Sequence, residues 1–149
     1  MARSLHAAAD RARIAERFAR LAADTPSRWG RMDVAQMLHH TNEALRMAMG
    51  ERVCAPRNKR IFRSFPLKHL IFYVLPFPKG APTAAELAVV TPCDFASEAQ
   101  RSRELLDRFG TGPVPDRGPE HPLFGPLSGR EWGILQHKHL DHHLRQFGV

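Results

Sequence analysis

The sequence predicts an all-α protein, built as a four-helix bundle with one short, kinked helical excursion and proline-rich connections. Three observations lead to this prediction. Apolar residues recur at helical spacing in four segments, capping boxes precede two of them, and no segment shows the alternation typical of a β-strand. The 149 residues fit a single domain spanning residues 1–149.

The first two helices are expected in the N-terminal third of the chain. An alanine-rich apolar stripe predicts a helix over Ser4–Ala23, and the breaker "DTPSRWG" follows it. The second helix is expected to begin after Asp33, whose side chain can cap the backbone while Gln36 reaches back. It should end at Gly50.

The middle of the chain is less regular. Residues 58–83, "NKRIFRSFPLKHLIFYVLPFPKGAPT", mix bulky apolar side chains with four prolines, which predicts an interrupted helical excursion and then a proline-rich loop. A third long helix is expected over Asp94–Gly110. A Gly- and Pro-rich connection then leads to the last helix, which Ser128 and Glu131 open as a capping box.

The formal net charge is +7, with a pI of about 10.4. Basic residues are spread along the chain, and no known nucleic-acid-binding motif accompanies them, so nucleic acid is not expected as a partner. A solvated basic face, or attraction of a small anionic substrate, explains the charge better. The densest basic patch consists of Arg52, Arg57, Lys59, Arg60, Arg63 and Lys68.

A soluble cytoplasmic protein is expected, and no membrane is expected as a partner. The two cysteines, Cys54 and Cys93, have no CxxC spacing, which favours a reducing compartment. The longest apolar run, His69–Phe77, is far shorter than the ~20 residues of a membrane-spanning helix. Charges every few residues at the N-terminus do not fit a signal peptide.

Histidines give the sequence its clearest chemical signal. His139 and His143 are four residues apart, so they share the face of the last helix that is expected to be buried. Two imidazoles stacked in this way form half of a typical metal site. His142 and His137 fall on flanking or solvent-facing sides.

The second helix can supply a third imidazole. His39 and His40 both flank its apolar line, so helical periodicity does not choose between them. Three imidazoles with one open position form the arrangement of a catalytic divalent metal. The cofactor expected is therefore a divalent ion, with Zn, Ni, Fe and Mn as the alternatives.

Two long stretches resemble the DinB-like (YfiT-type) metal-binding superfamily. They are "WGRMDVAQMLHH" and "HPLFGPLSGREWGILQHKHLDHHLRQFG", and the likeness is closest to a branch carried as a domain of unknown function. The resemblance implies a four-helix bundle with three histidine ligands. Its motifs fall on His40, His139 and His143, with His39 as the main rival for the first position and His142 as a weaker one.

The resemblance also implies a range of functions. The superfamily includes thiol S-transferases, thiol-dependent isomerases and proposed hydrolases, so a small-molecule substrate, such as a low-molecular-weight thiol, and a homodimer are expected. The matching residues are the metal ligands, which leaves the catalytic residues unknown. The alternative is a non-catalytic metal-binding, structural or stress-related module.

Several other residues carry expectations of their own. Glu43 and Gln136 lie one helical turn from the expected ligands, so they are candidates for orienting the imidazole rings. His121 is expected to have a structural role, as a cap or as packing beneath the last helix. Trp29 and Trp132 are expected to be packing residues.

Overall fold

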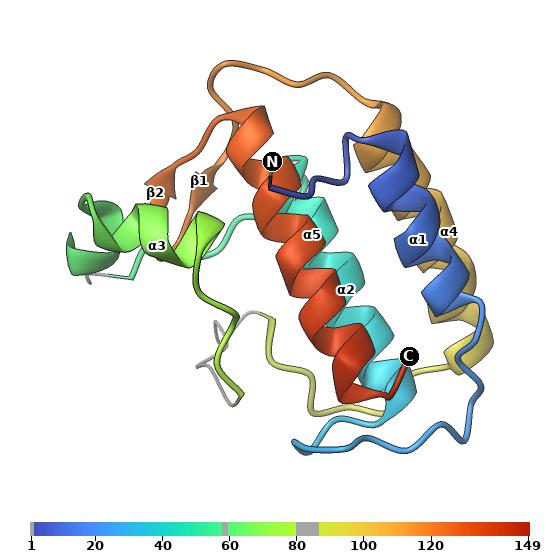
Figure 1. The fold of residues 1–149 in the computed structure, drawn as a ribbon. Helices are drawn as coiled ribbons and strands as arrows, with labels where there is room; N and C mark the ends of the chain where they lie inside the picture. The colour runs from blue at the N-terminus through green and yellow to red at the C-terminus, as the bar shows by residue number, and fades with distance from the viewer. Residues whose placement is uncertain (1, 58–59, 80–86) are drawn as a thin grey trace.

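The computed structural model of the chain describes residues 2–57, 60–79 and 87–149. It is mostly helical, and its four long helices are α1 (Ala8–Phe18), α2 (Val34–Ala48), α4 (Phe95–Thr111) and α5 (Gly129–Gln146). Both α1 and α2 pack against α4 and against α5 (Figure 1). The expected helical bundle is therefore confirmed.

Side-chain caps fix where the helices begin. In α2, the Asp33 carboxylate accepts the Gln36 N–H at 2.8 Å, and the Gln36 side chain accepts the Asp33 N–H in return. Ser128 and Glu131 make the same reciprocal pair at the start of α5. Both predicted capping boxes are thus confirmed, and they fix the register of the two histidine-bearing helices.

The first helix is shorter than predicted. The sequence predicts Ser4–Ala23, whereas α1 spans Ala8–Phe18 and its N-cap, Ala7, makes no side-chain cap. The segment before α1 is held in a different way, because the Leu5 N–H donates to the Gly133 carbonyl of α5. Alanine periodicity continues through the ends of a helix, so it did not mark these boundaries.

The excursion projects from one side of the bundle (Figure 1). It consists of the 3-10 turn η1 (Arg60–Arg63) and the short helix α3 (Leu67–Tyr73), which confirms the predicted interrupted helix. A small antiparallel hairpin pairs β1 (Glu120–His121) with β2 (Gly125–Pro126) beside it. The sequence pattern did not predict this hairpin, since two-residue strands are too short to show an alternation.

The core lies between the long helices. Its largest fully buried side chains include Trp132, Leu140 and Leu144 of α5 and Leu38 and Leu45 of α2. Within the described ranges, no helix has the length and apolar character to cross a membrane.

Candidate metal centre

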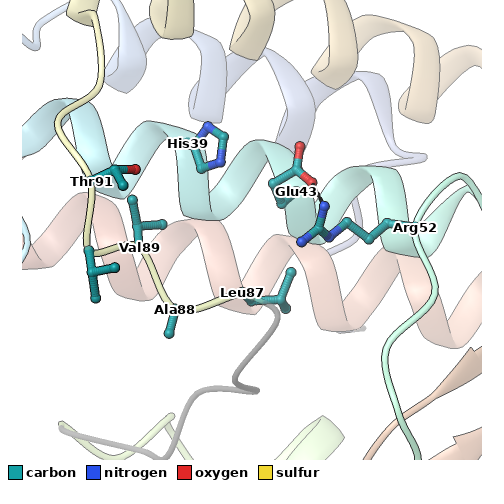
Figure 2. A pocket seen from close by; sticks show the side chains of 8 residues that line it. His39, Glu43, Arg52, Leu87, Ala88, Val89 and Thr91 are labelled. Atoms are coloured by element: carbon teal, nitrogen blue, oxygen red, sulfur yellow. Dashed lines mark ion pairs between the residues drawn. The ribbon is translucent and has the colours of Figure 1, made fainter.

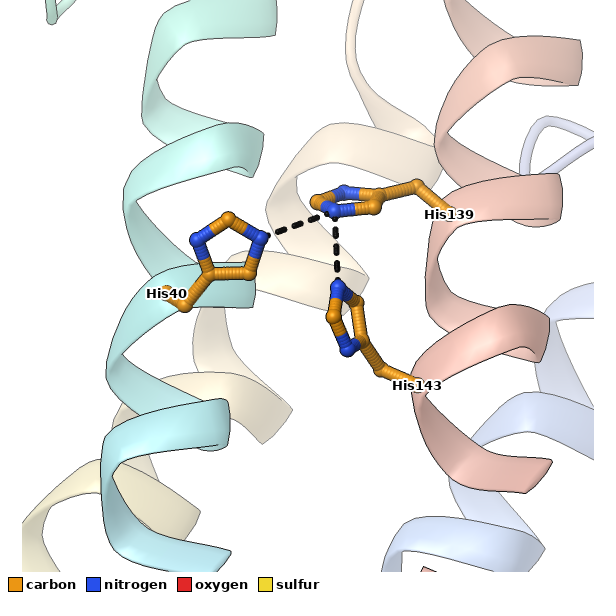
Figure 3. A group of neighbouring side chains, drawn as sticks. All are labelled: His40, His139 and His143. Atoms are coloured by element: carbon orange, nitrogen blue, oxygen red, sulfur yellow. Dashed lines mark hydrogen bonds between the residues drawn. The ribbon is translucent and has the colours of Figure 1, made fainter. Parts of the chain in front are cut away.

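Three imidazoles meet between α2 and α5 (Figure 3). The Nε2 atom of His139 lies 3.0 Å from Nε2 of His40 and 3.1 Å from Nε2 of His143. Their ligand atoms all lie within 4.8 Å of one another, and His40 and His143 are buried while His139 is half-buried. This histidine cluster can hold a metal ion.

Helix geometry brings these rings together. His139 and His143 are one turn apart on α5, and both point toward His40 on the facing helix α2. The residues join parts of the chain that are 99 positions apart. The cluster therefore depends on the packing of the bundle as well as on local helix structure.

Burial keeps the three rings neutral. Desolvation lowers the pKa of His40, and it lowers the pKa of His143 to about 3, with the neighbouring His40 adding to the effect. The pKa of His139 is held well below its ordinary value, first by desolvation and then by His143 and His40. Neutral imidazole is the form that binds a metal, so the ligands need not lose protons near neutral pH.

Hydrogen bonds at the far nitrogens orient two of the rings. The Nδ1–H of His40 donates to the Leu87 carbonyl at 2.9 Å. The Nδ1–H of His143 donates to the Gln146 side-chain oxygen at 2.8 Å. The Gln146 side-chain nitrogen donates to the Trp29 carbonyl at 2.7 Å, and this bond orients the amide so that its oxygen faces His143. Such partners orient a metal-binding histidine and set its tautomer.

These bonds leave the cluster with too few protons. With Nδ1 protonated, the neutral rings of His40 and His143 each present a lone pair at Nε2, toward Nε2 of His139. His139 has at most one Nε2–H to offer to both of them. His139 can therefore protonate at most one of these contacts, whereas a cation among the three nitrogens would accept electron density from all of them.

The cluster also has the size of a metal site. With metal–nitrogen bonds of about 2.0–2.1 Å in tetrahedral geometry, neighbouring ligand nitrogens lie about 3.3 Å apart. The observed separations of 3.0 and 3.1 Å, and the 4.8 Å limit for the group, approach this value.

Comparisons with protein-family models, curated proteins and solved structures found no match to this chain. The geometry of the histidine cluster therefore carries the functional argument. What the structure shows is a small, mostly helical protein with a three-histidine group that can hold a metal ion.

The two residues expected to orient the rings have other partners in the structure. The Glu43 carboxylate pairs with the guanidinium groups of Arg46 and Arg52, each at 2.9 Å. The Gln136 amide donates to the Ala44 carbonyl at 3.2 Å. Orientation comes instead from Gln146 and the Leu87 carbonyl. The "HxxHHxxQ" pattern already contained Gln146, whereas a backbone carbonyl leaves no signal in the sequence.

The remaining histidines lie outside the cluster. His39 faces α4, where its Nδ1 lies 2.9 Å from the Glu98 carboxylate. The ring of His142 packs edge-on against His143 and Trp29. His137 was expected on a flanking or solvent-facing side, but it is buried with 5% of its surface exposed. The interface of α5 with α1 accounts for this, since α1 covers a second side of the helix.

His121 has the structural role that the sequence suggests. Its Nδ1 accepts the backbone N–H groups of Leu123 and Phe124, at 3.1 and 3.2 Å, and so closes the turn between β1 and β2. Its ring also packs against Trp132, which starts the buried face of α5. Desolvation, with a contribution from Arg57, lowers the pKa of His121 to about 3.

A pocket of about 220 Å³ lies beside α2 (Figure 2). His39, Glu43 and Arg52 line it on the α2 side, and residues 87–91 line the other. Leu87 belongs to both places, because its side chain lines the pocket and its carbonyl accepts the His40 Nδ1–H.

The basic patch is divided between two places. Arg52 lies beside this pocket, whereas Lys68 pairs with Glu131 at 2.7 Å, near the start of α5. Glu131 precedes His139 by eight residues, which is about 12 Å along a helix. Lys59 lies outside the described residues.

Proposed function

We propose that this protein binds one divalent transition-metal ion through His40, His139 and His143. The observation that carries the proposal is the convergence of three neutral Nε2 atoms, two of them fixed as acceptors by hydrogen bonds at Nδ1. All-imidazole ligation suits Zn²⁺, Ni²⁺ and Fe²⁺, with Mn²⁺ as a further candidate.

The same geometry supports membership of the DinB-like superfamily. The ligand order in the chain, one histidine from the second bundle helix and two from the last, is the order that the resemblance implies. On this basis we propose a metal-dependent thiol S-transferase or hydrolase that acts on a small molecule. With three protein ligands, the bound ion would keep a position at which it can acidify a water molecule or bind a thiolate. Homodimerisation stays a prediction.

Metal content is the first test. Untagged protein, purified without chelator and without a nickel column, is analysed for bound elements. The expected result is about one divalent ion per chain. A protein that carries no such ion, and that refuses added Zn²⁺, Ni²⁺, Fe²⁺ and Mn²⁺, would overturn the proposal.

Variants assign the ligands. His40→Ala, His139→Ala and His143→Ala should each lose most of the bound metal, and circular dichroism confirms that each variant folds. The matched control is His39→Ala, which removes the neighbouring imidazole on the same helix and should keep the metal. The reverse pattern, with metal lost in His39→Ala and kept in His40→Ala, would assign the ligand to His39.

The second candidate is a metal that only holds the fold together. The structural role is favoured by the position of the three histidines, because His40 on α2 and His139 on α5 are 99 residues apart in the chain. A screen of the metal-loaded protein with a low-molecular-weight thiol and a set of electrophiles separates the two. Turnover that His139→Ala abolishes supports the enzyme, whereas inert protein whose folding stability depends on the metal supports the structural role.

A further inference from the structure

The net charge of the chain resides in one segment. Residues 52–85 contain seven of the 22 lysines and arginines and no aspartate or glutamate. Outside this segment, 15 basic residues are balanced by 15 acidic ones. The formal charge of +7 therefore arises from the part of the sequence that contains the excursion, where Arg52 and Lys68 form ion pairs with Glu43 and Glu131 of the bundle.

The same region carries the exposed apolar side chains. Among the described residues, nine large hydrophobic side chains are exposed, and six of these lie within residues 61–75. Phe65 is 84% exposed, and Ile61 and Val74 are each 64% exposed. A concentration of this kind is typical of an interaction surface, whereas scattered single residues are not.

One side of the excursion packs against the bundle. On this side, Phe72 is buried against Phe124, with ring centroids 5.1 Å apart. The Lys138 ammonium of α5 donates to the carbonyls of Ile71 and Leu75, which ties the end of α3 to the bundle. Figure 1 shows α3 projecting from the bundle on the side where β1 and β2 lie. The exposed apolar side chains therefore belong to a segment that is attached to the bundle.

Cationic and aromatic groups surround a shallow pocket on this excursion. The pocket has a volume of about 300 Å³, and Glu131 is its one acidic residue, paired with Lys68. The other lining residues are Arg63, Phe65, His69, Phe72 and Tyr73. Aromatic rings, exposed aliphatic side chains and cations side by side form the composition of a protein surface that lies in a membrane interface.

We propose that the η1–α3 excursion, residues 60–75, docks onto the surface of an anionic lipid bilayer. Arg63, which is exposed on η1, attracts negative headgroups, while Ile61, Phe65 and Val74 enter the boundary of the acyl region. The contact is peripheral and needs no helix that spans the bilayer, but it departs from the sequence-based expectation of no membrane partner.

Charge and chemistry favour a bilayer over the other occupants. A second copy of the chain would oppose two faces of like charge, which is unfavourable. Nucleic acid would satisfy the cations but would gain little from exposed Ile61 and Val74, because phosphate and sugar dominate its surface. At the surface of an anionic bilayer, both the cationic and the exposed apolar side chains make favourable contacts.

Sedimentation with lipid vesicles tests the proposal. The full-length protein is mixed with vesicles of phosphatidylcholine alone and with vesicles that also contain phosphatidylglycerol. Binding is expected to the phosphatidylglycerol vesicles, with an affinity that falls as salt is added. The double variant Phe65→Ser/Val74→Ser should bind these vesicles at least about tenfold more weakly than the wild type, because both apolar side chains are removed from the contact.

Matched controls separate this surface from general charge and stickiness. Val114→Ser removes an exposed apolar side chain elsewhere, and Arg103→Gln removes a cation from α4; both should bind as the wild type does. The proposal fails if phosphatidylglycerol vesicles are not bound at low salt, or if the double variant binds unchanged. It also fails if light scattering shows a dimer that the double variant abolishes, since a second copy then covers the surface.

Discussion

The side-chain amide of Gln146 links two parts of the proposed site. It accepts the His143 Nδ1–H and donates to the Trp29 carbonyl, so a single residue fixes both the tautomer of a proposed ligand and the position of the chain that precedes α2. Helical spacing instead favoured Gln136, because that residue is one turn from His139 on the same face. Spacing identifies which residues share a face, but it does not say which nitrogen of a ring a neighbour can reach.

Replacing Gln146 should weaken metal binding without removing a ligand. In Gln146→Leu the His143 ring loses its acceptor, and we expect the metal dissociation constant to rise by about 10- to 100-fold. Competition with a chromophoric chelator measures the constant. Gln136→Leu is the matched control, since Gln136 bonds to the Ala44 carbonyl, and its metal affinity should be unchanged. Equal effects in the two variants would refute this role for Gln146.

His121 gives the apoprotein a defined response to acid. Its pKa is about 3 in the folded chain and about 6.5 in an unfolded one, so between these values only the unfolded chain takes up the proton. Neutral His121 therefore does not reduce the free energy of unfolding above about pH 6.5, whereas the free energy of unfolding falls as the pH is lowered from 6.5 toward 3. His121→Asn keeps an acceptor for the two backbone N–H groups but does not titrate.

The measurement is the free energy of unfolding, from urea titrations at several pH values in this window. Its dependence on pH should be smaller in His121→Asn than in the wild type by about one proton. Identical slopes would show that His121 does not titrate on unfolding. The comparison uses apoprotein throughout, so that loss of metal does not contribute.

At the scale of elements, α3 depends on a residue of another helix. The Lys138 ammonium donates to the carbonyls at the end of α3, although burial lowers its pKa. A cation at these carbonyls satisfies groups that have no partner within the helix. Residues 60–75 contain no pattern that indicates a contact with Lys138. The sequence therefore predicted a helical excursion but not its attachment to α5.

Lys138→Met should therefore loosen α3 more than the bundle. We expect faster hydrogen exchange of the backbone amides near the end of α3, together with a loss of about 1 kcal/mol in global stability. Exchange monitored by mass spectrometry measures the local effect. Arg130→Met, an exposed change on the same helix, serves as the control, and similar exchange in both variants would contradict the assignment.

At the scale of the whole molecule, a bound metal would act as a clasp between α2 and α5. An ion that binds only the folded chain stabilises it by about 2.7 kcal/mol when its concentration is a hundred times the dissociation constant. We expect Tm to rise by about 2–4 °C for each kcal/mol, in scans with and without the selected metal. His40→Ala should show no such rise; an equal rise would place the stabilising ion elsewhere.

Some features of the fold and of the histidine cluster could be predicted from the sequence, and others could not. Capping residues such as Asp33 and Ser128 act locally, so they predicted the starts of α2 and α5 directly. The shared face of His139 and His143 followed from spacing alone. The choice between His39 and His40 did not, because it depends on how α2 rotates against α4 and α5. The structure turns His39 toward Glu98 and His40 toward α5.

The bond between Gln146 and the Trp29 carbonyl has an optical consequence. The chain has two tryptophans, and Trp132 is buried with its indole N–H held by the Pro119 carbonyl. The Trp29 indole is partly exposed, lies edge-on to His142, and has the Lys79 ammonium 4.5 Å above its ring. Intrinsic fluorescence therefore contains one emitter shielded by the core and one that lies next to His142, beside the histidine cluster. A paramagnetic ion such as Ni²⁺ bound at the proposed site would quench this emission, so tryptophan fluorescence offers a spectroscopic measure of the occupancy of the site.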